Sequence, residues 1–200
     1  MKNTRHHTIV HWGHNEFKTN LNVVKNLRKV YQYYPYLYEY DETEENTYLA
    51  AYLQSGKALD AFVCLQNEVV VGISIGCPLT TSMPICQGLD KFIHKDEQAY
   101  YFGDVIILKS AWGQGIADQL YQKHIDFVTR NNYSSIVALL VQRDEHDPRK
   151  PSHYQPSKLW TKHGFIDTKQ VTSHQWNTRS FSHAPPKPET HTMKVYKKIL

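Results

Sequence analysis

The sequence has little of what would mark a disulfide-bonded, membrane-spanning or strongly charged protein. Its 200 residues include 3 cysteines, an odd number without a C-x-x-C pair. This argues against a disulfide framework and a thiolate zinc site, and favours a reducing cytoplasm. No apolar run approaches the roughly 18 residues of a membrane span, and the first residues lack the apolar core of a signal peptide. The formal charge of +4 is too small to predict disorder or nucleic-acid binding.

Histidine and tyrosine are abundant instead, with 12 and 14 copies. Both residue types serve in acid-base chemistry, and histidine also binds metals. The histidines show neither the i, i+4 helical pairing nor the short fixed spacing of a zinc site, so we expect no metal site. Charge is unevenly spread, because residues 1–100 carry 9 basic and 11 acidic side chains whereas residues 101–200 carry 14 and 8. A polyanionic ligand would therefore bind in the second half.

Chain length and hydrophobic patterning predict one α/β domain over residues 1–200. Helical spacing predicts a helix over 16–34, another beginning at Asp41 with Glu44 as capping partner, and two more over 113–130 and 157–163. The predicted strands are 8–12, 58–65, 68–77, 100–108, 135–141, 165–171 and 192–200. This order predicts a mixed sheet of about seven strands flanked by about four helices.

The segment 105–117 carries the clearest chemical signal. An apolar strand runs into a turn with Gly113 and Gly115, and this turn opens an amphipathic helix. Glycine lets the backbone approach a ligand closely, and the first helical turn offers unpaired N–H groups and the positive end of the helix dipole. The segment is thus suited to phosphate or pyrophosphate, although alone it could be a tight turn. Neither the P-loop nor the dinucleotide glycine pattern fits, since Asp118 stands where the latter needs its third glycine.

Residues 112–117, together with Leu120, resemble the acetyl-CoA pyrophosphate motif of the GNAT N-acetyltransferase superfamily, Q/R-x-x-G-x-G/A. Gly115 and Ala117 match this motif, whereas Trp112 stands at the Arg/Gln position. The segment 159–165 is similar to the late aromatic-x-x-x-G-F segment of the superfamily, and the order of elements is also similar. Residues 35–38, 147–151, Tyr154 and 192–196 further resemble a poorly characterised bacterial subgroup.

The resemblance implies a GNAT-like mixed sheet in which two central parallel strands, 100–108 and 135–141, are splayed apart. It implies transfer of an acetyl group from acetyl-CoA, the co-substrate, to a primary amine of a small molecule or peptide by direct attack in a ternary complex. The cofactor-binding residues it implies are Ile106, Ile107, Leu108 and Lys109 along the pantetheine, Trp112, Gly113, Gln114, Gly115, Ile116, Ala117 and Asp118 at the pyrophosphate, and Trp160.

Two residues are predicted to be catalytic. Asp104 interrupts an apolar strand about where the family often carries a glutamate, and an alkylamine with a pKa near 10 needs a route for its proton. The alternative is an aspartate that binds backbone amides. Trp160 stands where the family usually has its acid tyrosine, and an indole N–H cannot protonate a thiolate. Tyr154 is the predicted substitute for this acid. The alternatives are that Tyr154 is an ordinary loop tyrosine, and that the thiolate leaves without an acid.

The acceptor should contact residues 35–40, 78–96 and 143–156, and the aromatic run 31–40 predicts either aromatic walls for it or a packing surface. The expected partners are acetyl-CoA and an amine, with no nucleic acid and no membrane, and a homodimer stays open. The departures at Trp112 and Trp160 motivate an alternative from another class, a non-catalytic acyl-CoA-binding sensor or partner module.

Overall fold

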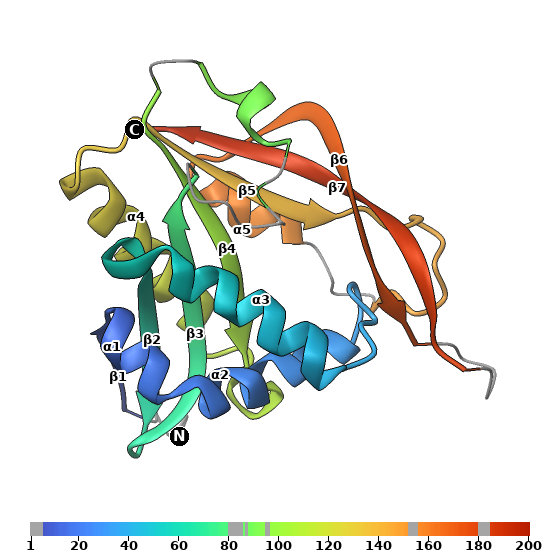
Figure 1. The fold of residues 1–200 in the computed structure, drawn as a ribbon, viewed down its shortest axis with the longest axis horizontal. Helices are drawn as coiled ribbons and strands as arrows, with labels where there is room; N and C mark the ends of the chain where they lie inside the picture. The colour runs from blue at the N-terminus through green and yellow to red at the C-terminus, as the bar shows by residue number, and fades with distance from the viewer. Residues whose placement is uncertain (1–5, 80–85, 87, 95–96, 152–155, 180–184) are drawn as a thin grey trace.

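The computed structural model describes residues 6–79, 86, 88–94, 97–151, 156–179 and 185–200, and within them seven strands form one mixed sheet (Figure 1). The order of strands across the sheet is β1-β2-β3-β4-β5-β7-β6. β4 and β5 are parallel, and the other neighbours are antiparallel. The strands are β1 (His7–Trp12), β2 (Asp60–Gln66), β3 (Val69–Pro78), β4 (Ala99–Ile107), β5 (Ser135–Val141), β6 (Ile166–Thr178) and β7 (Lys187–Ile199).

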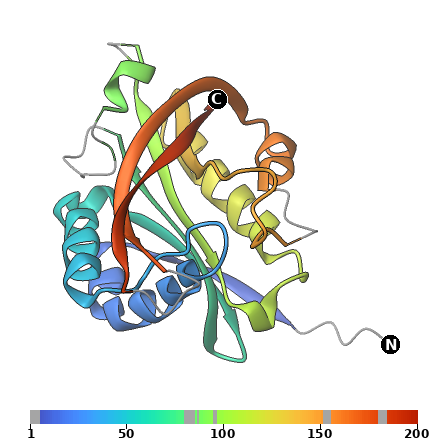
Figure 2. The ribbon, with the colours of Figure 1, turned by 90° about the vertical axis from the view of Figure 1, so that its right-hand side faces the viewer.

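Helices cover both faces of the sheet. Figure 2 shows the helices of the first half on one side and those of the second half on the other, so the fold has three layers. This confirms the predicted mixed sheet flanked by helices. The α-helices are α1 (His14–Thr19), α2 (Leu21–Arg28), α3 (Glu42–Gln54), α4 (Ile116–Arg130) and α5 (Pro156–Lys162), with short 3-10 helices η1 (Lys29–Gln32), η2 (Gly56–Ala58), η4 (Asp90–Phe92) and η5 (Lys109–Ala111). Among the described residues, no helix is long and apolar enough to cross a membrane.

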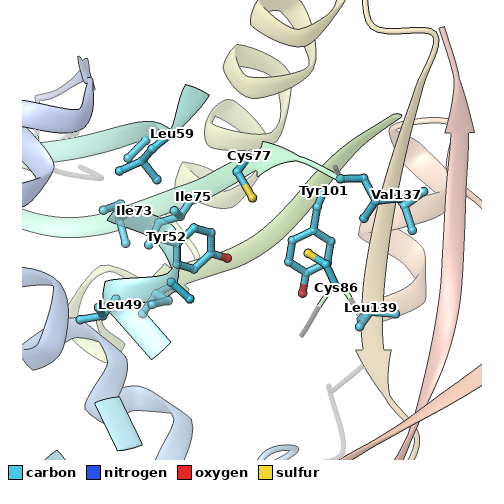
Figure 3. Packing of buried hydrophobic residues seen from close by; sticks show 14 of the residues in the cluster. Leu49, Tyr52, Leu59, Ile73, Ile75, Cys77, Cys86, Tyr101, Val137 and Leu139 are labelled. Atoms are coloured by element: carbon cyan, nitrogen blue, oxygen red, sulfur yellow. The ribbon is translucent and has the colours of Figure 1, made fainter. Parts of the chain in front are cut away.

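The main core lies between the sheet and the helices of the first half. Leu49 and Tyr52 of α3 pack against Ile73 and Ile75 of β3, and the cluster continues to Leu139 of β5 (Figure 3). Continuous burial of β5 agrees with its apolar sequence, which is typical of a strand covered on both faces. The core therefore fixes α3 over β3, β4 and β5, where the site described below is found.

The prediction of one continuous helix over 16–34 is wrong. The structure breaks it into α1, α2 and η1. The Thr19 hydroxyl donates to the carbonyl of Asn15, and the Asn20 amide donates to the carbonyl of Glu16. Such side chains compete with helical hydrogen bonding and favour helix ends. The break leaves α2 as a short separate helix, with Arg28 at its end.

The last two strands are longer than predicted, each with 13 residues. β6 runs on to Thr178 through a polar stretch that lacks apolar alternation, and there its backbone pairs with β7. The alternation of apolar residues did not predict this part of β6, because backbone hydrogen bonds to β7 rather than side-chain burial stabilise it. The extension carries β6 residues to the region of α3, where the Asn177 amide donates to Glu44 at 3.0 Å.

Candidate active site

A gap opens in the sheet where β4 and β5 stop pairing. The parallel pairs run from Ala99 with Ser135 to Phe102 with Ala138. Beyond them, β4 continues to Ile107 and β5 to Val141 without pairing to each other. Backbone groups of both strands are therefore left for another partner at this place. This confirms the splayed parallel strands that the sequence resemblance implied.

A cavity of about 400 Å³, the cofactor cleft, occupies this gap. Eight of the predicted cofactor residues line it: Ile106, Ile107, Trp112, Gly113, Gly115, Ile116, Ala117 and Trp160. The rest of its lining is Val30, Tyr31, Tyr33, Tyr34, Pro35, Tyr36, Gly103, Val105, Ala111, Tyr121, Leu139, Leu140 and Leu159. The cleft thus joins the splayed strands to the glycine turn before α4.

The glycine turn suits an anion. Gly113 and Gly115 have φ of 74° and 75°, in the left-handed region that favours glycine. A Cβ added at either position would meet no atom within 4 Å, so the space beside the turn is open. Gly115 caps the 15-residue helix α4 without a side-chain hydrogen bond to the first amides. These amides and the helix dipole suit the pyrophosphate of acetyl-CoA.

Four predicted cofactor residues lie outside the cleft lining. The Leu108 amide donates to the carbonyl of Val71 on β3, and the Lys109 ammonium lies 3.4 Å from the Tyr33 ring centroid. The Gln114 side chain accepts a hydrogen bond from the side-chain amide of Gln66 at 3.1 Å. The Asp118 carboxylate contacts Lys162 at 2.6 Å and His163 at 2.9 Å. The contacts of these four residues with the cofactor stay predictions. For Gln114 and Asp118, the predicted contacts are made by the backbone amides.

Two tryptophans shape the cleft. Trp112, at the position of the family Arg or Gln, is half exposed, and its indole N–H donates to the carbonyl of Ile107 at 2.8 Å. Trp160 is buried, with its ring centroid 4.8 Å from that of Tyr121 and 4.7 Å from that of Phe165. Trp160 therefore belongs to the aromatic core as well as to the cleft wall. Tyr154 lies outside the described residues, and its acid role stays a prediction.

Asp104 lies buried on β4 at the start of the gap and accepts four hydrogen bonds. One carboxylate oxygen accepts from Arg28 and from the Tyr31 hydroxyl, both at 2.7 Å. The other oxygen accepts from the hydroxyls of Tyr48 and Tyr52, at 3.0 and 3.2 Å. A carboxylate has about four lone-pair sites, so these donors occupy its capacity. Side chains rather than backbone amides are its partners.

Arg28 joins this carboxylate to a second one. Its guanidinium also donates to both oxygens of Glu45 on α3, at 2.6 and 3.2 Å. Burial alone would lower the pKa of Arg28, but the charges of Asp104 and Glu45 more than offset this and raise the pKa. The three side chains form a buried charge cluster of net charge −1 that connects α2, α3 and β4.

A second cavity, the aromatic cavity, of about 720 Å³, lies beside this cluster. Its lining is Arg28, Tyr31, Tyr36, Tyr38, Thr43, Glu44, Glu45, Thr47, Tyr48, Tyr101, Gly103, Asp104, Leu139, Ser173, His174, Gln175, Trp176 and Met193. Tyr31, Tyr36, Gly103 and Leu139 line both cavities, so the two meet there. Tyrosines of the predicted aromatic run thus form a cavity wall.

Two polar side chains of the aromatic cavity have spare capacity. Glu44 accepts from the Tyr38 hydroxyl and the Asn177 amide, at 3.2 and 3.0 Å, and forms no ion pair with any described residue. His174 Nε2 is buried and lacks a hydrogen-bond partner in the described part of the chain. Burial lowers the pKa of His174, so the imidazole is neutral at pH 7. Among the described residues, the side chain of Glu44 therefore accepts hydrogen bonds only from the neutral side chains of Tyr38 and Asn177.

Sequence reasoning missed Arg28 and Glu45, although a signal was present. Arg28 follows Leu21 and Val24 on the apolar stripe of its helix, and Glu45 stands one turn before Leu49 on α3. Charged residues on a core-facing stripe are rarely buried unless they are paired. Two such residues of opposite sign on successive helices indicate a buried pair. The contribution of β6 had no signal of this kind, because its polar end was not predicted as strand.

Several solved structures share this fold at low sequence identity. An N-acetyltransferase from Staphylococcus aureus Mu50 has 17% identity and a TM-score of 0.58, covering 97% of this chain and 98% of that one. Arabidopsis thaliana Naa50, in complex with a bisubstrate analogue, has 18% identity and a TM-score of 0.56, with 96% and 99% covered. The ribosomal-protein-S18-alanine N-acetyltransferase from Escherichia coli has 11% identity and a TM-score of 0.58, with 97% and 94% covered.

Comparison at the level of sequence gives two results. A search of curated protein sequences gives no significant match. The family model described as the acetyltransferase (GNAT) family matches residues 23–153. This range contains both splayed strands, the glycine turn and the charge cluster, and the cavity beside the cluster shares four lining residues with the cofactor cleft. The chain therefore belongs to the GNAT acetyltransferase family, and it transfers an acetyl group from acetyl-CoA.

Proposed function

We propose that the acceptor is a primary alkylamine that carries a second positive charge and enters the aromatic cavity. The observation that carries this proposal is the junction of the two cavities at Tyr31, Tyr36, Gly103 and Leu139. An amine nitrogen at this junction would lie beside the acetyl group of a cofactor bound in the cleft. Direct attack in a ternary complex needs this proximity.

The charge of the aromatic cavity supports a cationic acceptor. Three carboxylates and one arginine line it, and His174 is neutral, so its net charge is −2. Glu44 is absent from the cofactor cleft, so it lies away from the junction. We place the second ammonium of the acceptor near Glu44 and the reacting nitrogen at the junction. Tyr38 and Trp176 offer ring faces that also attract cations.

On the cofactor side, we propose that acetyl-CoA binds along the cofactor cleft and at the glycine turn. Acetyl-CoA supplies an acetyl group activated as a thioester. The amides of residues 114–118 hold its pyrophosphate, and a backbone N–H near Ile106 or Ile107 stabilises charge on the acetyl oxygen. The Trp112 indole N–H occupies the Ile107 carbonyl, so this carbonyl does not compete with the backbone amides for the cofactor.

Asp104 stays in the site, and the geometry favours a positioning role for it. Its four donors leave no lone pair for the proton of an amine unless a tyrosine gives way. Its carboxylate orients the buried hydroxyl of Tyr52 and, along the cavity wall, the hydroxyls of Tyr31 and Tyr48. A role as direct base is the alternative, and the stability and turnover of Asp104→Asn separate the two roles.

We also propose a cytoplasmic location. The sequence has an odd number of cysteines without a C-x-x-C pair, and Cys64 is buried and free. Free cysteines are the ordinary state in a reducing compartment.

The acceptor class is tested with three amines of equal chain length: cadaverine, pentylamine and the corresponding ω-amino acid. We expect kcat/KM to be highest for cadaverine and lowest for the amino acid, since Glu44 attracts a cation and repels a carboxylate. Glu44→Gln should reduce the preference for cadaverine over pentylamine by about fivefold, because a partly exposed charge pair contributes up to about 1 kcal/mol.

Glu42→Gln is the matched control, because it removes the same charge from α3 at a residue that does not line the cavity. It should leave the preference unchanged. Equal kcat/KM for all three amines would contradict the proposed acceptor class. Tight binding of CoA without transfer to any amine would instead favour the non-catalytic acyl-CoA-binding module.

A further inference from the structure

Tyr36 is held in place by its backbone and its ring. Its carbonyl oxygen accepts from Arg143, which follows β5, at 2.8 Å, and from the Trp176 indole of β6 at 3.1 Å. The guanidinium of Arg143 also donates to the carbonyl of Pro35 at 2.6 Å. The Tyr36 ring lies 4.5 Å from the Tyr31 ring and 6.1 Å from that of Trp176, measured between centroids. Arg143 and Trp176 thus fix a loop residue at the junction of the cavities.

The hydroxyl of Tyr36 has no hydrogen bond to any residue that the structure describes. In contrast, the hydroxyls of Tyr31, Tyr48 and Tyr52 donate to Asp104, and that of Tyr38 donates to Glu44. Burial, followed by the charge of Asp104, raises the pKa of Tyr36, so the phenol keeps its proton at neutral pH. A pre-positioned tyrosine whose hydroxyl has no partner among the described residues therefore lines both the acceptor cavity and the cofactor cleft.

The reaction offers such a group a role, because overall one proton is lost by nitrogen and one can be gained by sulfur. The amine nitrogen bonds to the acetyl carbon, the carbon–sulfur bond breaks, and sulfur leaves with the electron pair. Trp160 cannot supply a proton to it. We propose that the Tyr36 hydroxyl relays this proton, donating to the departing sulfur and recovering the proton that the nitrogen loses. The relay balances the reaction without any further reactant.

This inference rests on the proposed function, so its test includes a readout that needs no acceptor. Tyr36→Phe should lower kcat about 100-fold, at the low end for general acid–base catalysis because a thiol is already a fair leaving group. The KM for the amine should stay within about threefold, since the ring remains. With CoA alone, a donor hydroxyl favours the thiolate, so the thiol of CoA bound to Tyr36→Phe should ionise about one pH unit higher than on the wild type. The ultraviolet absorbance of the thiolate measures this.

Tyr133→Phe is the matched control, because Tyr133 packs against a separate buried cluster that includes Tyr100 and Ile136, and it lines neither cavity. It should leave both kcat and the thiolate titration unchanged. The relay is overturned if the thiolate titration of Tyr36→Phe coincides with that of the wild type, whether or not an amine acceptor has been found. If no amine is acetylated but the titration shifts as expected, the proposed acceptor fails while the contact of Tyr36 with sulfur stands.

Discussion

At the scale of single residues, the charge cluster decides how the site is held. Arg28 is buried between two carboxylates, and each of them lines the aromatic cavity. A buried pair of charges is weak evidence for net stability, but removal of one partner is costly because the other stays buried and uncompensated. The cluster therefore acts as a structural element that positions the tyrosine hydroxyls, and its loss should affect folding before chemistry.

Asp104→Asn distinguishes a positioning role from a direct base. The variant keeps the size of the side chain but leaves Arg28 with one carboxylate, so we expect the free energy of unfolding to fall by about 3 kcal/mol. Urea denaturation measures this. Asp126→Asn, which removes a charge on α4, should stay within about 0.5 kcal/mol of the wild type. Unchanged stability of Asp104→Asn together with a large loss of kcat would support the base.

Residue identity in the site was only partly predictable. Asp104 stood out because it interrupts an apolar strand. Its partners Tyr31, Tyr48 and Tyr52 come from two other elements, and one sequence does not reveal which tyrosines meet one carboxylate. Glu44 was recognised as a capping residue, and the Asp41 side chain does accept from the Glu44 amide at 2.8 Å. The side chain of Glu44 turns instead to Tyr38 and Asn177, which depends on the unpredicted end of β6.

At the scale of elements, the glycine turn and α4 form the cofactor-binding unit. Gly115→Ala places a side chain at a φ of 75°, which costs about 1 kcal/mol of stability. Since the added Cβ meets no protein atom, the fold should survive, and the methyl group would extend into the space beside the turn. We expect the affinity for CoA, measured by isothermal titration calorimetry, to fall about tenfold, equivalent to about 1.4 kcal/mol.

Gly56→Ala is the control for backbone strain. Gly56 has a φ of 62° and equally open surroundings, but it lies in η2, away from the cofactor cleft. Its stability loss should match that of Gly115→Ala, and its affinity for CoA should equal that of the wild type. Equal CoA affinities for all three proteins would show that the turn does not hold the cofactor.

Helices and strands were predictable where burial imposes a regular spacing of apolar residues. β5 has the predicted bounds because both of its faces are covered, and β1, β4 and α4 follow the apolar patterns closely. The first helix and the β6–β7 pair departed from the prediction, because side-chain hydrogen bonds break the former and backbone pairing extends the latter. The extension of β6 supplies Ser173, His174, Gln175 and Trp176 to the aromatic cavity, so the acceptor side was less predictable than the cofactor side.

At the scale of the whole molecule, the two halves of the sequence differ in net charge and supply different parts of the site. The first half of the sequence, with net charge −2, supplies Arg28, Glu44 and Glu45 to the aromatic cavity. The second half, with net charge +6, supplies the glycine turn and α4. A cationic acceptor and an anionic cofactor would thus approach from oppositely charged parts of the protein. The gap between β4 and β5 is where they would meet.

The most direct test of this account is the stoichiometry of transfer. Wild-type protein is mixed with acetyl-CoA and cadaverine, free CoA is measured by its thiol, and acetylated cadaverine is measured by mass spectrometry. We expect the two products to form in equal amounts, at a rate that rises with the cadaverine concentration and saturates. Release of CoA at a rate independent of the amine, with no acetylated product, would contradict it.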